Sequence, residues 1–450
     1  MKRRNREPLV FILRILISVG VFVIALSSVM VHRLQGFTDN VSHSHGYPPL
    51  TPDWNTPITE DSHWPHPFIH VVNTRFQQEQ ANLIDLGRAR LALFETFCLN
   101  SIVGQTVLNK QHGTPFLWIL KVDPELHEDL LRDLIGLVEP YDFIYVVASN
   151  VNFGVGQREG GWRGGEAGRD VLSSRIYSGD RTRLEQAHSA RETRAVLETR
   201  IDVDDGLHLE YFENIQAEAL SKLRWAPDQA DRRTQRWIYM CSLRSIDWNP
   251  TPRSHNVDPH NEFGVFIPRK SPHVCITPGI TIGVSIGVQE SEVPRFGHFD
   301  LVRNLRNGGS KNRVQCGAGS RTKCLRLLAS PFFGAMRSRT PTSAGMRDIL
   351  LDGDRFERRL DSSVTNNATW LTVELWKSFH CRLDHVVRTN LHLQVHVVDI
   401  AADNLRGQCT KGHSCKNSTK DALLNLLLAT NATVEVETHD GSAPTSRVLR

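Results

Sequence analysis

The sequence of 450 residues predicts an α/β fold, in which a mostly parallel β-sheet is flanked by helices. Two observations support this class. Short apolar runs typical of buried strands alternate with segments whose apolar residues recur at helical spacing. A later apolar run ends in three closely spaced aspartates, and α/β sheets place their ligands at such strand ends.

Strand, helix, strand, helix and strand are predicted in that order after residue 67. The strands are FIHVVNTRF (68–76), PFLWILKV (115–122) and DFIYVVAS (142–149). The first helix carries Leu91, Phe94, Cys98 and Ile102 on one face. Asp123 is expected to cap the second helix, with Pro124 at its first position. The apolar face of this second helix comprises Leu126, Leu130, Leu134 and Leu137.

Residues 152–194 interrupt this order with glycines, arginines and dense charge, and are predicted to be a solvent-exposed insertion. The glycines do not have the spacing of a dinucleotide-binding fingerprint. The sheet is expected to resume with AVLETRIDVDD (195–205), followed by a helix that contains Leu209, Phe212, Ile215 and Leu220. Further β structure is expected from RWIYMCSL, FGVFIPR and GITIGVSIGV.

The N-terminus combines a basic flank with an apolar run. Lys2, Arg3, Arg4 and Arg6 precede the run that extends to Val31, so residues 1–31 are predicted to be an uncleaved transmembrane signal anchor with a cytosolic tail. A signal peptide cleaved near Ala25 is the alternative. Residues 32–67, rich in Pro, Ser, Thr and His, are typical of a luminal stem. They precede the predicted domain at 68–405 and a C-terminal glycosylated tail at 406–450.

A luminal address is also indicated by four glycosylation sequons and by the cysteines. The sequons are at Asn40, Asn367, Asn417 and Asn431. Eight cysteines permit disulfides, and Cys316 with Cys324 and Cys409 with Cys415 are close enough for local loops. We therefore expect a single-pass type II membrane protein of the Golgi or endoplasmic reticulum. The net charge of +4 is small and scattered, so no nucleic-acid partner is expected.

The aspartates Asp202, Asp204 and Asp205 form the most informative motif. In an extended strand, Arg200, Asp202 and Asp204 share one face. Crowded carboxylates at a strand end are explained by a divalent cation or a metal-bound diphosphate, which cancels their mutual repulsion. The alternative is a solvated turn, because Asp-Asp-Gly is a common turn sequence. A calcium loop of the EF-hand type is excluded by the spacing.

Several motifs in the same order resemble a rhamnosyltransferase family of the glycosyltransferase-A type. They are NTRF, GRARLALFETFCLNSIVGQT, FLWILKVD, ETRIDVDDGL and SRTPTSAGM, and they span about residues 68–405 apart from the insertion. The resemblance implies a nucleotide-diphosphosugar transferase fold. It also implies that the three aspartates match the Asp-x-Asp element of that family.

The resemblance implies a metal-dependent sugar transfer. Asp204 and Asp205 would hold manganese or magnesium, and Asp202 would contact the nucleotide ribose or support the metal shell. His396, in a late apolar strand LHLQVHVVDIAADNLRG, is the candidate for a further metal ligand, although the spacing departs from the family and His392 is close by.

Other residues are candidates for binding the nucleotide sugar. Arg75 and Arg200 are expected to contact nucleotide or phosphate, with surface salt bridges as the alternative. Thr342 or Ser343 is expected at the N-terminus of a helix near Met346, either as a phosphate site or as a plain cap. An inverting transfer needs a carboxylate base. The candidates for this base are Glu290, Glu292 and Asp300, with Asp247 as a further option.

The leading hypothesis is a membrane-anchored luminal glycosyltransferase that moves a sugar, for instance rhamnose, from a nucleotide-diphosphate donor to a glycan or glycoprotein. The alternative is a catalytically inactive luminal carbohydrate-binding protein with the same fold. The intact acidic cluster favours the enzyme, because a pure binding protein has no evident need for three crowded carboxylates.

Overall fold

The computed structural model describes residues 68–108, 116–151, 166–191, 193–225, 235–250, 262–305, 315–317, 323–343 and 368–410. The predicted anchor, the stem and all four sequons lie outside these ranges. None of the helices within them is long and apolar enough to cross a membrane.

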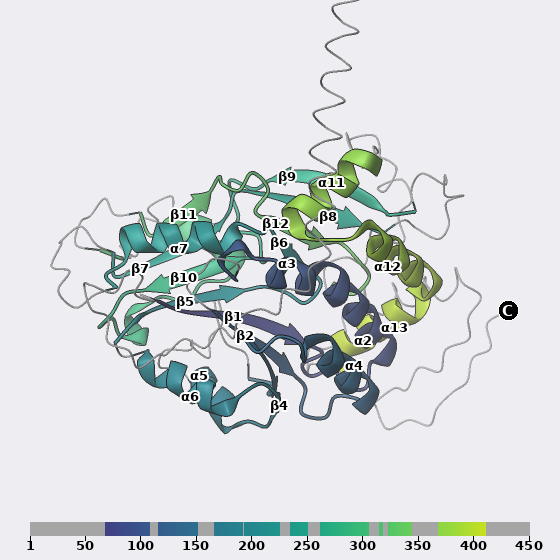
Figure 1. Cartoon of the computed structure of the whole chain (residues 1–450), viewed down its shortest axis with the longest axis horizontal. Helices are drawn as coiled ribbons and strands as arrows, with labels where there is room; N and C mark the ends of the chain where they lie inside the picture. The colour runs from purple at the N-terminus through teal and green to yellow at the C-terminus, as the bar shows by residue number, and fades with distance from the viewer. Residues whose placement is uncertain are drawn as a thin grey trace, which may run out of the picture. The chain divides into compact units, whose positions relative to one another are not determined.

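The larger of two sheets has eight strands in the order β11-β7-β10-β5-β1-β2-β3-β4 (Figure 1). Its strands are β1 (Phe68–Phe76), β2 (Phe116–Val122), β3 (Ile144–Ala148), β4 (Ile176–Ser178), β5 (Ala195–Arg200), β7 (Trp237–Ser242), β10 (Ile280–Val284) and β11 (Leu325–Leu328). Strands β3, β2, β1 and β5 run parallel, whereas β10 is antiparallel to both of its neighbours and β4 is antiparallel to β3. The predicted mostly parallel sheet is therefore confirmed at its centre.

A second sheet has four strands in the order β6-β12-β8-β9. These are β6 (Gly206–Leu207), β8 (Arg244–Asn249), β9 (Val265–Lys270) and β12 (Ala335–Ser338). The short strand β6 follows directly on the acidic cluster and pairs with β12. The three aspartates therefore lie in the connection between the two sheets.

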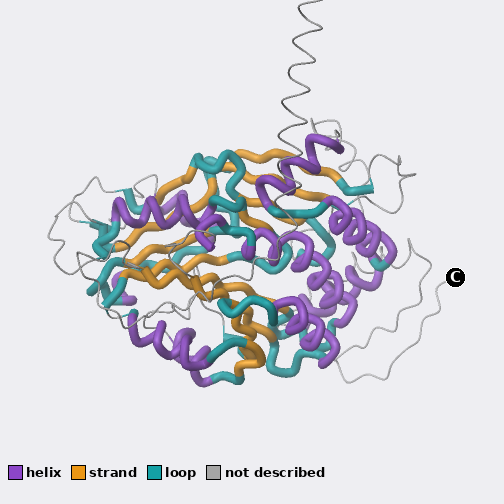
Figure 2. Tube along the Cα trace, viewed as in Figure 1, coloured by secondary structure: helices purple, strands orange, loops and turns teal. Residues whose placement is uncertain are grey.

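Helices cover both faces of the parallel strands (Figure 2). The first helical segment comprises α2 (Ile84–Leu93), the π-helical turn η1 (Phe94–Leu99) and α3 (Asn100–Val103), followed by the short η2 (Thr106–Leu108). Later come α4 (Glu128–Val138), α5 (Glu166–Ser173), α6 (Arg181–Ala190), α7 (Tyr211–Lys222), η4 (Glu290–Glu292), α8 (His298–Leu305), α11 (Ala368–Phe379), α12 (Leu383–Val395) and α13 (Val397–Thr410).

The continuous apolar character of the central strands follows from burial on both faces. All seven residues of β2 are buried, and in β1 only Arg75 is exposed. On one face, Phe116 and the imidazole of His70 pack against Phe212 of α7, with ring centroids 5.0 and 4.8 Å away. The other face of the same strands packs against α5 and α6, which contribute Val171, Leu184 and Ala187 to its core.

Part of the predicted insertion is a structural layer of the fold, so that prediction is wrong for residues 166–194. This segment contains α5, α6 and the edge strand β4. Leu184 and Ala187 are fully buried, and Asp180 caps α6 by accepting a hydrogen bond from the Thr182 amide at 2.8 Å. The dense charge that suggested a loop lies on the outer face of an amphipathic helix. Residues 152–165 lie outside the described ranges.

Two further element predictions need correction. The second helix begins at Glu128 rather than after Asp123, because the Asp123 carboxylate accepts from the Glu125 amide at 2.9 Å and so organises a preceding turn. The late apolar run is not a strand but forms α12 and α13. The buried positions of α12 include Val386, before the run, and Leu393, within it, which are seven residues apart as on one helical face. The predicted boundary at residue 405 falls inside α13.

Candidate functional site

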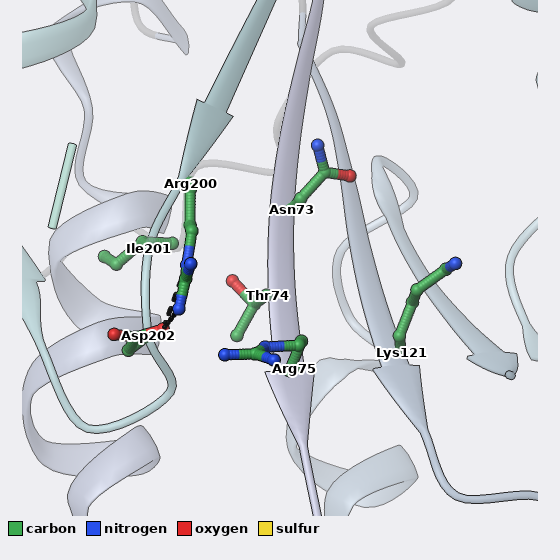
Figure 3. A pocket seen from close by; sticks show the side chains of 7 residues that line it. All are labelled: Asn73, Thr74, Arg75, Lys121, Arg200, Ile201 and Asp202. Carbon is green, nitrogen blue, oxygen red and sulfur yellow. Dashed lines mark hydrogen bonds and ion pairs between the residues drawn. The ribbon is translucent and has the colours of Figure 1, made fainter. Parts of the chain in front are cut away.

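The parallel half of the large sheet contains a topological switch point. Strands β2 and β3 lie on one side of β1, and β5 lies on the other, so the carboxyl ends of β1 and β5 diverge toward different connections. Ligands of open α/β sheets bind in the crevice at such a point. A pocket is present there, lined by Asn73, Thr74, Arg75, Lys121, Arg200, Ile201 and Asp202 (Figure 3).

The strand register explains why polar side chains gather in this pocket. Asn73 of β1 is opposite Arg200 of β5, and Arg75 is opposite Lys121 of β2. Paired residues, and residues two apart on one strand, project from the same face of a sheet. Three cations and one amide are therefore placed together where the strands end. The Lys121 ammonium is already bound, to the Val151 carbonyl at 2.7 Å and to Asp170 at 3.2 Å.

Asn73 stands out because its polar atoms are buried without a protein partner. The residue is 5% exposed. Among the described residues, neither Oδ1 nor Nδ2 of its amide has a hydrogen-bond partner. A buried polar group that lacks a partner costs about 1–3 kcal/mol. A donor and an acceptor side by side in a ligand pocket are suited to an edge of a nucleobase.

Asp202 is held in the pocket by Arg200. Its Oδ1 accepts from Nη2 of Arg200 at 3.1 Å and from Nε at 3.3 Å. Burial raises the pKa of the Asp202 carboxyl, but the charges of Arg200 and Arg75 outweigh this effect and leave the pKa below its ordinary value. Asp202 is therefore an anion that Arg200 binds directly and Arg75 stabilises by its charge. The ion pair with Arg200 is of the kind that the alternative expected, and contact of Arg75 and Arg200 with nucleotide or phosphate stays a prediction.

Asp204 is nearly buried and accepts hydrogen bonds from two hydroxyl groups. Thr342 and Ser343 donate to its Oδ2 at 3.1 and 3.2 Å. Burial and the charge of Asp202 raise the pKa of Asp204, although the guanidinium of Arg90 acts in the opposite direction. The structure thus brings Thr342 and Ser343 to the acidic cluster, a contact that the sequence analysis did not predict. The helix expected near Met346 lies outside the described residues.

Asp205 is also nearly buried, and its Oδ1 accepts from the Ser338 amide of β12 at 3.0 Å. Burial and the charges of Asp204 and Asp202 raise the pKa of Asp205 well above its ordinary value, whereas Arg337 lowers it. The strand β5 ends at Arg200, and a turn closed by the Asp205 amide and the Asp202 carbonyl at 3.1 Å follows. The expected strand alternation through Asp204 is therefore wrong, because the chain turns before it.

The carboxylates have the donor chemistry that a hard divalent cation requires. The mutual repulsion that raises the pKa values of Asp204 and Asp205 is also what a cation would relieve. In the ranges that the structure describes, however, no group of three or more His, Cys, Asp or Glu side chains is placed to hold a metal ion. Metal binding by Asp204 and Asp205 stays a prediction.

His396 does not join the aspartates in such a group. It ends α12, and its ring is tilted against that of His392, with centroids 4.8 Å apart. The two histidines are one helical turn apart rather than beside a strand. Metal binding by His396 stays a prediction.

Asp247 is surrounded by three arginines on the second sheet. The side chain is 2% exposed, and Arg337, Arg269 and Arg339 approach its carboxylate to 2.7, 3.3 and 3.4 Å. We call these four residues the Asp247 cluster. Because its carboxylate is buried and paired three times, Asp247 is poorly placed to accept a proton from a substrate.

Two of the candidate bases are also engaged in the fold. Glu290 pairs with Arg295, which bridges to the buried Glu198 at 3.4 Å. Glu292 accepts from the Gln289 amide at 2.8 Å and so closes a capping box. Asp300 is half exposed at the start of α8 and remains the candidate with an accessible carboxylate.

His298, at the start of α8, was not singled out by its sequence pattern. Burial lowers the pKa of its imidazole, Arg200 lowers it further, and the charge of Asp202 opposes them. Arg337 and Asp300 also act on this histidine. Charged groups of both the pocket and the Asp247 cluster therefore influence His298. Asn73 and Arg90 lie inside the quoted motifs NTRF and GRARLALFETFCLNSIVGQT but were not singled out, and Arg337 lies just before SRTPTSAGM. The sequence pattern alone does not show which residues of a motif reach the site.

Comparisons with known proteins add little to this geometry. No protein-family model matches the chain, and no curated protein matches it. Among solved structures, the crystal structure of S. aureus TarS 1-349 is similar at 8% sequence identity and a TM-score of 0.21. That alignment covers 85% of this chain and 100% of the TarS chain. A likeness at this TM-score carries no argument about fold or function.

Proposed function

We propose that the chain transfers a sugar from a nucleoside-diphosphate donor to a glycan or glycoprotein. The observation that carries this proposal is the pocket at the switch point, where Arg75 and Arg200 flank Asp202 and the other two aspartates follow within three residues. Cationic side chains bind phosphate groups, and crowded carboxylates bind the cation that accompanies them. The eight-stranded mixed sheet is consistent with the nucleotide-diphosphosugar transferase fold that the sequence resemblance implies.

Within this proposal each group has a chemical task. Arg75 and Arg200 bind the diphosphate, and the unpartnered amide of Asn73 reads the nucleobase. Asp204 and Asp205 would hold manganese or magnesium, which neutralises charge on the departing diphosphate. Rhamnose is the sugar that the family resemblance suggests, and Asp300 is the base candidate.

Calorimetry on the purified chain tests the donor site. We expect nucleoside diphosphates to bind with manganese present, and to bind at least tenfold more weakly after chelation of the metal. A panel of nucleoside diphosphates with four different bases, each also tested as its rhamnose and glucose conjugates, then identifies the donor. Glycan binding that is indifferent to both metal and nucleotide would instead establish the carbohydrate-binding alternative.

We also propose that the domain is luminal and anchored by residues 1–31. The structure has disulfides between Cys316 and Cys324, a pair whose spacing allowed a local loop, and between Cys241 and Cys275. Disulfides persist mainly in oxidising compartments. When the full chain is expressed in a eukaryotic host, N-glycosidase treatment should increase its electrophoretic mobility. Unchanged mobility, together with free thiols at these four cysteines, would refute the luminal assignment.

A further inference from the structure

We propose that the Asp247 cluster is an anion-binding subsite for the diphosphate of the donor, next to the acidic cluster. This proposal rests on the proposed function, because it assigns a second set of residues to the same ligand. Neither Arg269 nor Arg337 belongs to a sequence motif singled out above, whereas Arg339 lies in SRTPTSAGM, close to Thr342 and Ser343.

The cluster carries more positive charge than it neutralises. Three guanidinium groups surround one carboxylate, so the group has a net charge of about +2. A carboxylate accepts about four hydrogen bonds, whereas three guanidinium groups offer about fifteen donors. The Nε of Arg339 lies 3.4 Å from Oδ2 of Asp247 and makes no hydrogen bond among the described residues. One carboxylate cannot accept from all of these donors, so the remaining N–H groups can donate to a further anion.

The register places these groups on one face of the second sheet. Arg337 of β12 is opposite Asp247 of β8, and Arg269 of β9 is opposite Ser245, two residues before Asp247. The Ser245 hydroxyl is buried on this face and also lacks a hydrogen-bond partner in the described part of the chain. The alternate residues Ile246 and Trp248 pack into the core. This face therefore gathers donors and excess charge, whereas the opposite face is apolar.

The arginines are accessible enough to bind a ligand. The side chains of Arg269, Arg339 and Arg337 are 41%, 33% and 21% exposed, although the carboxylate between them is 2% exposed. A bound anion would thus meet guanidinium groups whose positions are already set by Asp247. Such preorganisation lowers the entropic cost of binding.

The cluster adjoins the acidic site. Ser338, the residue after Arg337, donates its amide to Asp205 at 3.0 Å. Both Arg200 of the pocket and Arg337 of the cluster act electrostatically on His298. A ligand with charge on two neighbouring groups can contact cations of both the pocket and the cluster. Diphosphate is the ligand of this chemistry that the proposed function already supplies.

The test compares pyrophosphate and nucleoside diphosphate binding, by calorimetry in metal-free buffer, for the full chain and for Arg269→Gln, Arg339→Gln and the double variant. Arg337 is left in place so that Asp247 keeps its closest partner. We expect each single variant to weaken binding of both probes about tenfold, and the double variant to weaken it about a hundredfold. Arg382→Gln is the matched control, because Arg382 is an exposed arginine paired with one carboxylate.

The outcomes separate this proposal from the proposed function. Wild-type affinity for pyrophosphate and nucleoside diphosphate in the double variant would overturn the subsite and leave the donor site intact. Binding of pyrophosphate that depends on the cluster, without any nucleotide binding, would support an anion subsite and refute the nucleotide donor. If Arg339→Gln does not fold, the comparison of Arg269→Gln with Arg269→Lys tests the subsite. Because Lys keeps the charge, Arg269→Lys should retain part of the affinity that Arg269→Gln loses.

Discussion

Replacing Asp205 by Asn should reduce sugar transfer by at least two orders of magnitude while the fold persists. Asn keeps the volume of the side chain, and its Oδ1 can still accept the Ser338 amide that Asp205 binds at 3.0 Å. What the variant loses is an anionic ligand, and stabilisation of a departing diphosphate by a bound ion is worth several kcal/mol. Asp204→Asn should act similarly, because Thr342 and Ser343 can still donate to the amide oxygen.

Thermal denaturation should show that neither variant is destabilised. The raised pKa of Asp205 means that its charged form is disfavoured in the folded chain, so a neutral Asn should leave the free energy of unfolding equal or slightly higher. The exposed Asp384, on α12, supplies the control Asp384→Asn, which should retain activity. Asp202→Asn should affect metal affinity less than the other two. If both Asp204→Asn and Asp205→Asn keep full metal-dependent transfer, the carboxylates only form a turn and the assignment of the metal site is wrong.

Acid unfolding should depend strongly on His70. Its imidazole is fully buried in β1, lies 2.8 Å from the Thr199 hydroxyl and packs edge-on against Phe212. Burial lowers the pKa of His70 from 6.5 to about 3. Between these values the unfolded chain binds one more proton than the folded chain, so the free energy of unfolding falls as the pH falls. The slope is about 1.4 kcal/mol per pH unit, and the loss sums to roughly 5 kcal/mol.

Urea denaturation at several pH values between 7 and 4 measures this contribution. His70→Gln should be less stable than the wild type at pH 7, because it loses ring packing, but its stability should fall more gently with acid. His273 is exposed, so His273→Gln should keep the wild-type slope. Identical slopes for the wild type and His70→Gln would mean that the buried imidazole does not control acid stability.

The sequence predicted the central strands well, because strands buried on both faces require continuous apolar runs. FIHVVNTRF coincides with β1, and the turn after it leads into the predicted helical segment. The sequence also predicted that the acidic cluster follows a central strand, because the run that ends at Arg200 is apolar and three aspartates come after it. Local disulfide spacing was informative for Cys316 and Cys324, whereas the bond between Cys241 and Cys275 joins distant segments and left no signal.

The sequence pattern predicted the wrong type of element where one face of a helix is charged and the other is apolar. The charged outer face of α6 suggested a loop, and alternating apolar residues in α12 and α13 suggested a strand, because only packing partners reveal which side is buried. The expected alternation through Asp204 failed for a related reason. A period of two holds only while the strand continues, and pairing in the sheet ends at Arg200.

The sequence alone predicted an α/β chain, the positions of its central strands and the carboxylates that follow one of them. The tertiary structure alone decided which side chains meet those carboxylates. Thr342 reaches Asp204 across 138 positions, and Arg337 pairs with Asp247 across 90. Such contacts depend on strand order and register, which are set by long-range pairing and burial of the whole sheet rather than by local composition.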